Sequence, residues 1–256
     1  MAVVLWHLEL SHYNENARWA LDYKRIPHVR RVPIPGLHGI AALVASRGAQ
    51  RRLPVLELDG RHVGDSTAII AALEAYQPEP PLYPDDPDER ARALALEDWF
   101  DEELGPNLRR YVWHHTLPDD DATAAALFTS PSPGRERMLR QGSAAAGLLV
   151  RLDYGIDDER AALARDRVVA AMDRLEAELQ PSGYLAGDRF SVADLAAAAL
   201  FTPVIAPPER PYVPAWATPP VQELRDELTA RPGGQWVHEM YARHRGERAA
   251  PRASAA

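Results

Sequence analysis

The feature that most constrains the fold is a proline-rich segment that divides the chain into two unlike parts. Four prolines fall between residues 77 and 84. A helix cannot continue through them, because proline lacks the backbone N–H and its ring clashes with the preceding turn. Before this segment, short apolar runs typical of strands alternate with helical periodicity; after it, only helical periodicity is found. The sequence therefore predicts an α/β domain followed by an all-α helical domain.

The first part predicts a small mixed sheet with helices. Strands are expected over residues 3–8, 28–32, 55–58 and 61–63, and helices over 11–23, 40–45 and 66–76. Asp59-Gly60 stands between the last two strands and is a strong signal for a tight antiparallel hairpin. Asp65 or Ser66 is expected to cap the helix that follows.

The second part predicts helices throughout. They are expected over residues 87–117, 135–153, 159–179, 221–230 and 235–243, with a kink at Gly105-Pro106 and a loop over 203–220. Ser191 and Asp194 form the pattern of a capping box. The acidic triplet 119–121 is interpreted as a solvated turn rather than a metal site. The predicted division is a domain over 1–77, a linker over 78–86, a helical domain over 87–245 and a disordered tail over 246–256.

Composition excludes several classes of function. The chain has no cysteine, so disulfides, thiolate metal sites and a cysteine nucleophile are excluded. Its net charge of −8 gives no electrostatic reason to expect nucleic acid or an anionic membrane as a partner. Neither a secretory signal nor an apolar stretch of membrane-spanning length is visible, so a cytoplasmic protein is expected.

Ser11 lies where the first predicted strand passes into the first predicted helix. The first N–H groups of a helix lack partners and carry partial positive charge, so such a junction favours an anion. A hydroxyl at this point can donate one further hydrogen bond to that anion. The simpler interpretation, that Ser11 or Asn14 only caps the helix, remains open at this stage.

Four motifs in register resemble the cytosolic glutathione S-transferases, in a serine-type form similar to bacterial members. The motifs are Ser11…Arg18-Trp19-Ala20-Leu21, Leu53-Pro54-Val55-Leu56, Asp65-Ser66-Thr67-Ala68-Ile69 and Ser191-Val192-Ala193-Asp194. The resemblance implies a thioredoxin-like N-terminal domain and an all-helical C-terminal domain. It also implies glutathione as co-substrate, no metal, a small-molecule electrophile as second substrate, a homodimer and a role in detoxification.

The resemblance also assigns candidate site residues. Ser11 matches the catalytic residue that faces the glutathione sulfur. Leu53 matches the residue whose backbone pairs with the cysteinyl part of glutathione, and Pro54 matches the family's cis-proline. Asp65 and Ser66 match the pair that binds the γ-glutamyl end, although the family more often has glutamate where this chain has Asp65.

The second substrate is expected between the two domains. The residues assigned to its pocket are Leu10, Tyr13, Arg109 and Trp113. Arg109 is a candidate for binding an anionic electrophile, with an exposed surface arginine as the alternative. Tyr13 is a rival hydroxyl donor and His12 a possible base, whereas ordinary side-chain habits favour Tyr13 in the pocket wall and His12 partly exposed.

The function predicted from these residues is conjugation or isomerisation of a small electrophile by a glutathione thiolate. A serine cannot form a mixed disulfide with glutathione, so thiol transfer is not favoured. The alternative is a glutathione-transferase-like protein that binds a ligand or a partner without turnover.

Overall fold

The computed structural model describes residues 3–33, 37–127, 147–148, 150–212 and 217–249. The N-terminal domain is built on a four-stranded sheet of order β2-β1-β3-β4. Its strands are β1 (Val3–Trp6), β2 (His28–Arg31), β3 (Val55–Leu58) and β4 (Arg61–Gly64). β1 pairs with β2 in parallel, and β3 is antiparallel to both β1 and β4. This mixed sheet confirms the α/β character predicted for the first part of the chain.

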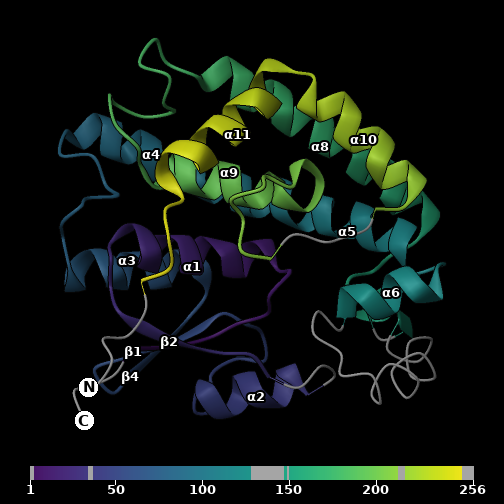
Figure 1. Cartoon of the computed structure of the whole chain (residues 1–256), viewed down its shortest axis with the longest axis horizontal. Coiled ribbons are helices and arrows are strands. Elements are labelled where there is room, and N and C mark those ends of the chain that lie inside the picture. The colour runs from purple at the N-terminus through teal and green to yellow at the C-terminus, as the bar shows by residue number, and fades with distance from the viewer. Residues whose placement is uncertain (1–2, 34–36, 128–146, 149, 213–216, 250–256) are drawn as a thin grey trace.

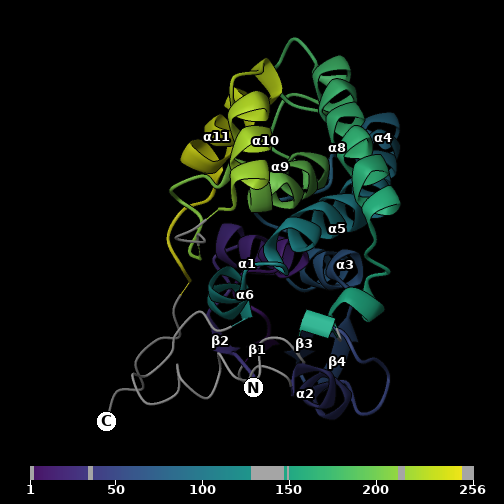
Figure 2. The same ribbon diagram turned by 90° about the vertical axis from the view of Figure 1, so that its right-hand side faces the viewer.

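The hairpin between β3 and β4 has the predicted turn. Asp59 and Gly60 both have positive φ, 48° and 81°, as a two-residue turn between antiparallel strands requires. Three helices cover the sheet: α1 (His12–Tyr23), α2 (His38–Ala45) and α3 (Ser66–Tyr76). Figures 1 and 2 show α1 and α3 on one side of the sheet and α2 on the other.

The C-terminal domain is helical in the part that the structure describes. Its elements are α4 (Pro87–Trp99), a π-helix η1 (Phe100–Leu104), α5 (Gly105–Thr116), α6 (Asp120–Leu127), α8 (Asp158–Glu178), α9 (Val192–Ile205), α10 (Pro219–Thr229) and α11 (Pro232–His244). None of the described helices is long and apolar enough to cross a membrane. The predicted helix 135–153 lies largely outside the described residues.

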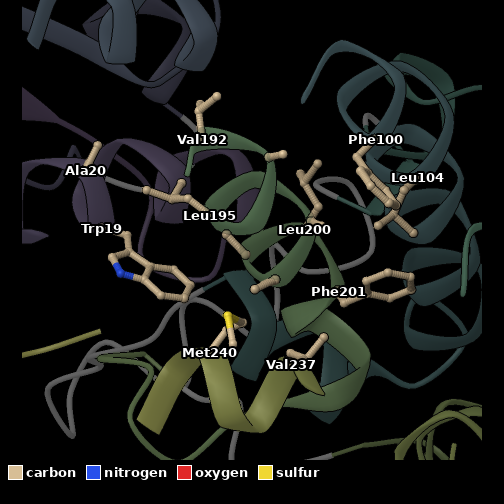
Figure 3. Close-up of a cluster of buried hydrophobic side chains, with 14 of the residues drawn as sticks. Trp19, Ala20, Phe100, Leu104, Val192, Leu195, Leu200, Phe201, Val237 and Met240 are labelled. Carbon is tan, nitrogen blue, oxygen red and sulfur yellow. The ribbon is translucent and has the colours of Figure 1, made fainter. Parts of the chain in front are cut away.

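Helix α9 is the centre of the core. It packs against α1, α4, α5, α10 and α11, and almost all of its residues are buried. Figure 3 shows apolar side chains from α1, η1, α9 and α11 gathered around it. The predicted capping box fixes its start: the Asp194 carboxylate accepts the Ser191 N–H at 2.8 Å and the Ser191 hydroxyl at 2.7 Å. Because α9 contacts both domains, it holds α1 in a fixed position.

Three predictions for the helical part were wrong in detail. The expected single helix over 87–117 contains the π-helix η1, so its distortion begins before Gly105-Pro106. The acidic triplet is not a turn: the Asp119 carboxylate accepts the Ala122 N–H at 2.9 Å, and Asp120 begins α6. Helix α9 continues through Pro203 to Ile205, because the buried face of α9 outweighs the preference of proline to end a helix.

The segment that follows α11 returns to the N-terminal domain. The Trp19 indole N–H donates to the His244 carbonyl at 3.0 Å, and Arg245 is 1% exposed. The Ala249 N–H donates to the Asp22 carboxylate at 3.0 Å. The tail predicted to be disordered from residue 246 is therefore bound to α1 as far as residue 249, and residues 250–256 lie outside the described part.

Candidate functional site

Ser11 is the N-cap of α1, and its hydroxyl oxygen accepts two hydrogen bonds from Asn14. The Asn14 backbone N–H lies 3.4 Å away and the Asn14 side-chain amide lies 2.7 Å away. A hydroxyl has two acceptor lone pairs and one donor hydrogen. Both lone pairs are used within the helix start, so the hydrogen of Ser11 is directed elsewhere. The cap interpretation is thus confirmed, and it leaves the donor function intact.

Asn14 also joins the helix start to the loop before β3. Its side-chain oxygen accepts the Leu8 N–H at 3.0 Å, and its amide donates to the Leu53 carbonyl at 3.2 Å. The Leu53–Pro54 bond is cis, as predicted. The Gln50 amide closes this loop by donating to the Pro54 carbonyl at 3.0 Å. The Asn14 side chain therefore holds Ser11 next to the loop that contains the cis-proline.

Asp65 and Ser66 stand at the start of α3. Asp65 is the N-cap, and its carboxylate accepts the N–H groups of Thr67 and Ala68 at 3.0 and 3.3 Å. Its φ of 72° lies in a region that is strained for a residue other than glycine, a feature that often marks functional sites. Ser66 is buried at the first position of the helix. A carboxylate ligand is favoured at such a helix start.

His12 and Tyr13 contact the distorted part of the long helix. In a π-helix the acceptor for residue 106 is residue 101, but Pro106 has no N–H to donate. The Tyr13 hydroxyl donates to this Asp101 carbonyl at 2.8 Å. His12 Nε2 lies 3.1 Å from the Gly105 carbonyl oxygen. The π-helix therefore supplies a backbone acceptor that the Tyr13 side chain uses across the domain boundary.

This arrangement changes the roles considered for both residues. His12 is buried rather than partly exposed, because the Gly105 carbonyl gives its ring a partner inside the protein. Burial lowers the pKa of His12 well below its usual value, so it is a neutral ring. Burial likewise raises the pKa of Tyr13, whose proton is already donated to Asp101. Neither geometry favours Tyr13 or His12 as the group that activates a thiol.

The buried carboxyl group of Glu97 and the half-buried one of Asp101 lie beside the start of α3. Burial and the nearby charges of Asp65 and Asp98 raise the pKa of Asp101 to about 7. Burial, opposed by a hydrogen bond from Thr67, raises the pKa of Glu97 to about 8. Among the described residues, none donates a hydrogen bond to Glu97 Oε2 or Asp101 Oδ1.

The residues assigned to the second-substrate pocket are only partly brought together. The guanidinium carbon of Arg109 lies 5.6 Å from the centre of the Tyr13 ring and 4.2 Å from that of Tyr154. Arg109 is half-buried, not an exposed surface arginine. Leu10 stands beside Ser11 in the chain, but no described contact joins it or Trp113 to the Arg109 group.

Sequence reasoning missed three residues that organise the site. Asn14 was considered only as a helix cap, although its side chain links three backbone segments. Arg18 and Arg210 are buried and donate to the carbonyls of the loop before α1. The i, i+7 spacing from Ser11 to Arg18 was the only local signal, and Arg210 had none. Within the described part of the chain, no group of three or more possible metal ligands is found.

Comparison with known families matches both parts of the chain. The sequence profile of the glutathione S-transferase N-terminal domain matches residues 5–81, and that of the C-terminal domain matches residues 157–228. The first match contains Ser11, Leu53, Pro54, Asp65 and Ser66. The second contains the capping box of α9.

Individual proteins show the same fold. FtsZ-localized protein A from Caulobacter vibrioides is 28% identical over 205 residues, covering 76% of this chain and 74% of that protein. A glutathione S-transferase from Rhodospirillum rubrum superimposes with a TM-score of 0.58 at 22% identity, covering 92% of this chain and 91% of the other. A glutathione S-transferase from Methylobacterium radiotolerans, in complex with glutathione sulfonate, superimposes with a TM-score of 0.56 at 22% identity. The match covers 92% of this chain and 93% of the other.

Proposed function

This chain belongs to the glutathione S-transferase family, and from that premise we propose that it is an enzyme that activates glutathione through the Ser11 hydroxyl. The thiolate then adds to a small electrophile or promotes its isomerisation. The Leu53 backbone holds the cysteinyl part of glutathione, and Asp65 and Ser66 hold the γ-glutamyl end. The fold and the family are established; the catalytic activity is the proposal.

One observation carries the proposal. Asn14 donates hydrogen bonds to both lone pairs of the Ser11 hydroxyl. The hydroxyl hydrogen of Ser11 is therefore available to a ligand at the positive end of α1. A thiol of pKa about 8.5 is only about 3% thiolate at pH 7, and lowering that pKa by about two units requires about 2.7 kcal/mol. A hydrogen bond to a charged group contributes about 1.5–3 kcal/mol, and a helix N-terminus adds about 0.3–1 kcal/mol. The hydrogen bond from Ser11 and the N-terminus of α1 together are sufficient to lower the pKa of the thiol by about two units.

The test is the pH–rate profile of Ser11→Ala against a generic aromatic electrophile. The pKa of bound glutathione should rise by about one to two units, because a charge-assisted hydrogen bond is lost. At pH 7 and saturating thiol, conjugation should fall by about three- to twenty-fivefold as the thiolate fraction falls, and higher pH should restore much of it. Ser66→Ala is the contrasting variant: it should raise KM for glutathione with kcat little changed, because its contact is similar in ground and transition states. An unchanged profile in Ser11→Ala would leave Ser11 as a helix cap only.

A second candidate function is binding of a ligand or partner without turnover. The 28% identity to FtsZ-localized protein A favours it, since the name of that relative refers to a location and to no reaction. Absence of thiolate absorbance when the wild-type protein is saturated with glutathione, together with absence of turnover across several electrophiles, would favour this second function.

A further inference from the structure

The loop before α1 is held by its carbonyl groups. Four consecutive carbonyls, those of residues 8–11, accept hydrogen bonds from buried arginines. Arg18 donates to three of them, Leu8 at 2.8 Å, Glu9 at 2.9 Å and Ser11 at 3.3 Å. Arg210, which lies 200 positions further along the chain, donates to the Leu10 carbonyl at 2.7 Å. The negative ends of these peptide groups therefore point into the protein, away from the half-exposed side of Ser11.

The two arginines belong to a buried charge cluster with a positive excess. Four guanidinium groups, those of Arg18, Arg30, Arg210 and Arg245, meet two carboxylates, those of Glu15 and Asp22. The half-buried carboxyl group of Glu9 also interacts electrostatically with Arg18. With Glu9 ionised, these described groups together carry one more positive charge than negative charge. The two histidines beside the cluster add no further positive charge, because burial lowers the pKa of His7 and that of His28 and leaves both rings neutral at pH 7.

Within the described part of the chain, no carboxylate forms an ion pair with Arg210. Its guanidinium donates to two backbone carbonyls, those of Leu10 at 2.7 Å and Thr202 at 3.4 Å. Burial lowers its pKa to about 10, so it remains charged at pH 7. It is 2% exposed and comes from the segment after α9, so the helical domain places this charge behind the Ser11 loop.

We propose that Arg210 is a positioning residue for thiol activation: with Arg18 it fixes the turn that carries Ser11 and places unbalanced positive charge behind the bound thiolate. This inference rests on the proposed function and deepens it. A buried cation acts on a nearby anion with little screening by solvent. The helical domain thereby tunes the chemistry of a thiol that the N-terminal domain binds.

The experiment compares the pKa of bound glutathione, followed by thiolate absorbance, in three variants. Arg210→Met loses both the charge and the hydrogen bonds, Arg210→Gln keeps a donor for Leu10 without charge, and Arg210→Lys keeps the charge. The pKa of bound glutathione should rise by about one unit in Arg210→Met and Arg210→Gln, which lowers the thiolate fraction at pH 7 about threefold, and by much less in Arg210→Lys. KM for glutathione should change less than kcat at pH 7, and high pH should restore kcat. If Arg210→Met does not fold, the Gln and Lys variants decide the question.

The matched control is Arg225→Met. Arg225 also donates to a backbone carbonyl, that of Val204 at 2.6 Å, and burial also lowers its pKa, but it does not contact the Ser11 loop. The Arg225→Met variant should be less stable than wild type, and the pKa of its bound glutathione should be unchanged. If the pKa of bound glutathione is equal in wild type and in Arg210→Gln, the role of Arg210 is overturned, whereas the proposed function is not. A wild-type protein that binds glutathione without ionising it would overturn the proposed function and this inference together.

Discussion

Two pairs of carboxyl groups lie where the domains meet, and their partners differ: arginines contact one pair, whereas mainly other acids lie near the second pair. Glu15 and Asp22 on α1 each contact Arg245, and each has a second arginine beside it. Burial alone would raise the pKa of Glu15, but Arg245 and Arg18 lower it to about 2. Glu97 and Asp101, on α4 and η1, have no cation in contact among the described residues, and their pKa values rise to about 8 and 7.

The contrast shows that burial does not decide the charge of a carboxyl group; its partners do. On the α1 side, guanidinium groups keep Glu15 ionised, and Arg245 binds the segment after α11 to α1. Beside α3, burial and neighbouring acids outweigh the opposing charge of Arg109 at Asp101, so Glu97 and Asp101 retain their protons to higher pH. The first pair should therefore be essential to the folded state, and the second should be a source of pH-dependent instability.

Removing the shared cation should have the largest effect. Arg245→Met leaves Glu15 and Asp22 buried with their pairing reduced, and breaking such a buried pair costs about 3–5 kcal/mol of unfolding free energy. Urea denaturation at pH 7 measures the loss. Arg243→Met is the control: its pair with Glu239 is half-exposed, so its loss should stay below about 0.5 kcal/mol. A loss of unfolding free energy below about 1 kcal/mol in Arg245→Met would contradict the view that the arginine-paired carboxylates of α1 are essential to the folded state.

Glu97→Gln should stabilise the protein, in contrast to Arg245→Met, and the size of the effect should depend on pH. The pKa of Glu97 is raised in the folded state, so its contribution to stability is fully present below about pH 4.5 and is lost as the pH rises through about 8. Glutamine cannot ionise and can keep a hydrogen bond with Thr67. We expect little change in Tm at pH 5 and a rise of roughly 2–6 °C at pH 8, measured by thermal unfolding. Equal Tm differences at the two pH values would show that Glu97 is ionised throughout.

Tyr13→Phe should have the smallest effect. It leaves the Asp101 carbonyl without the donor that replaces the missing N–H of Pro106, and losing such a bond costs about 0.5–1.5 kcal/mol. The pH–rate profile should not move, because the Tyr13 proton is not directed at the thiol. Tyr76→Phe, on an exposed ring, should change neither quantity. A raised pKa of bound glutathione in Tyr13→Phe would make Tyr13 the thiol activator and contradict the assignment to Ser11.

Local signals in the sequence were enough for much of the fold. The Asp59-Gly60 turn and the Ser191 capping box depend on residues within a few positions of one another, and both are present as predicted. The cis bond at Leu53–Pro54 followed from the family resemblance and is also present. The binding roles of Leu53, Asp65 and Ser66 remain predictions.

What the sequence could not supply are contacts between distant positions. His12 was expected to be partly exposed, because nothing near it in the chain shows that the Gly105 carbonyl will cover it. Gly105-Pro106 predicted a distortion but not its type, since the π-helix is completed by a tyrosine about 90 positions earlier. No local pattern marks Arg210 or Arg245, and the N-terminal partners of both arginines are more than 190 positions away.

The return of Arg245 to α1 also has a consequence for how the protein is made. Helix α1 leaves the ribosome before the helical domain does, yet Glu15 and Asp22 receive their shared cation only after residue 245 has been added. A nascent N-terminal domain therefore holds an incompletely neutralised helix during most of synthesis. Domains usually fold one after another as they emerge. Here the N-terminal domain is completed only after the helical domain, because α1 reaches its native surroundings once α11 and residue 245 have been added.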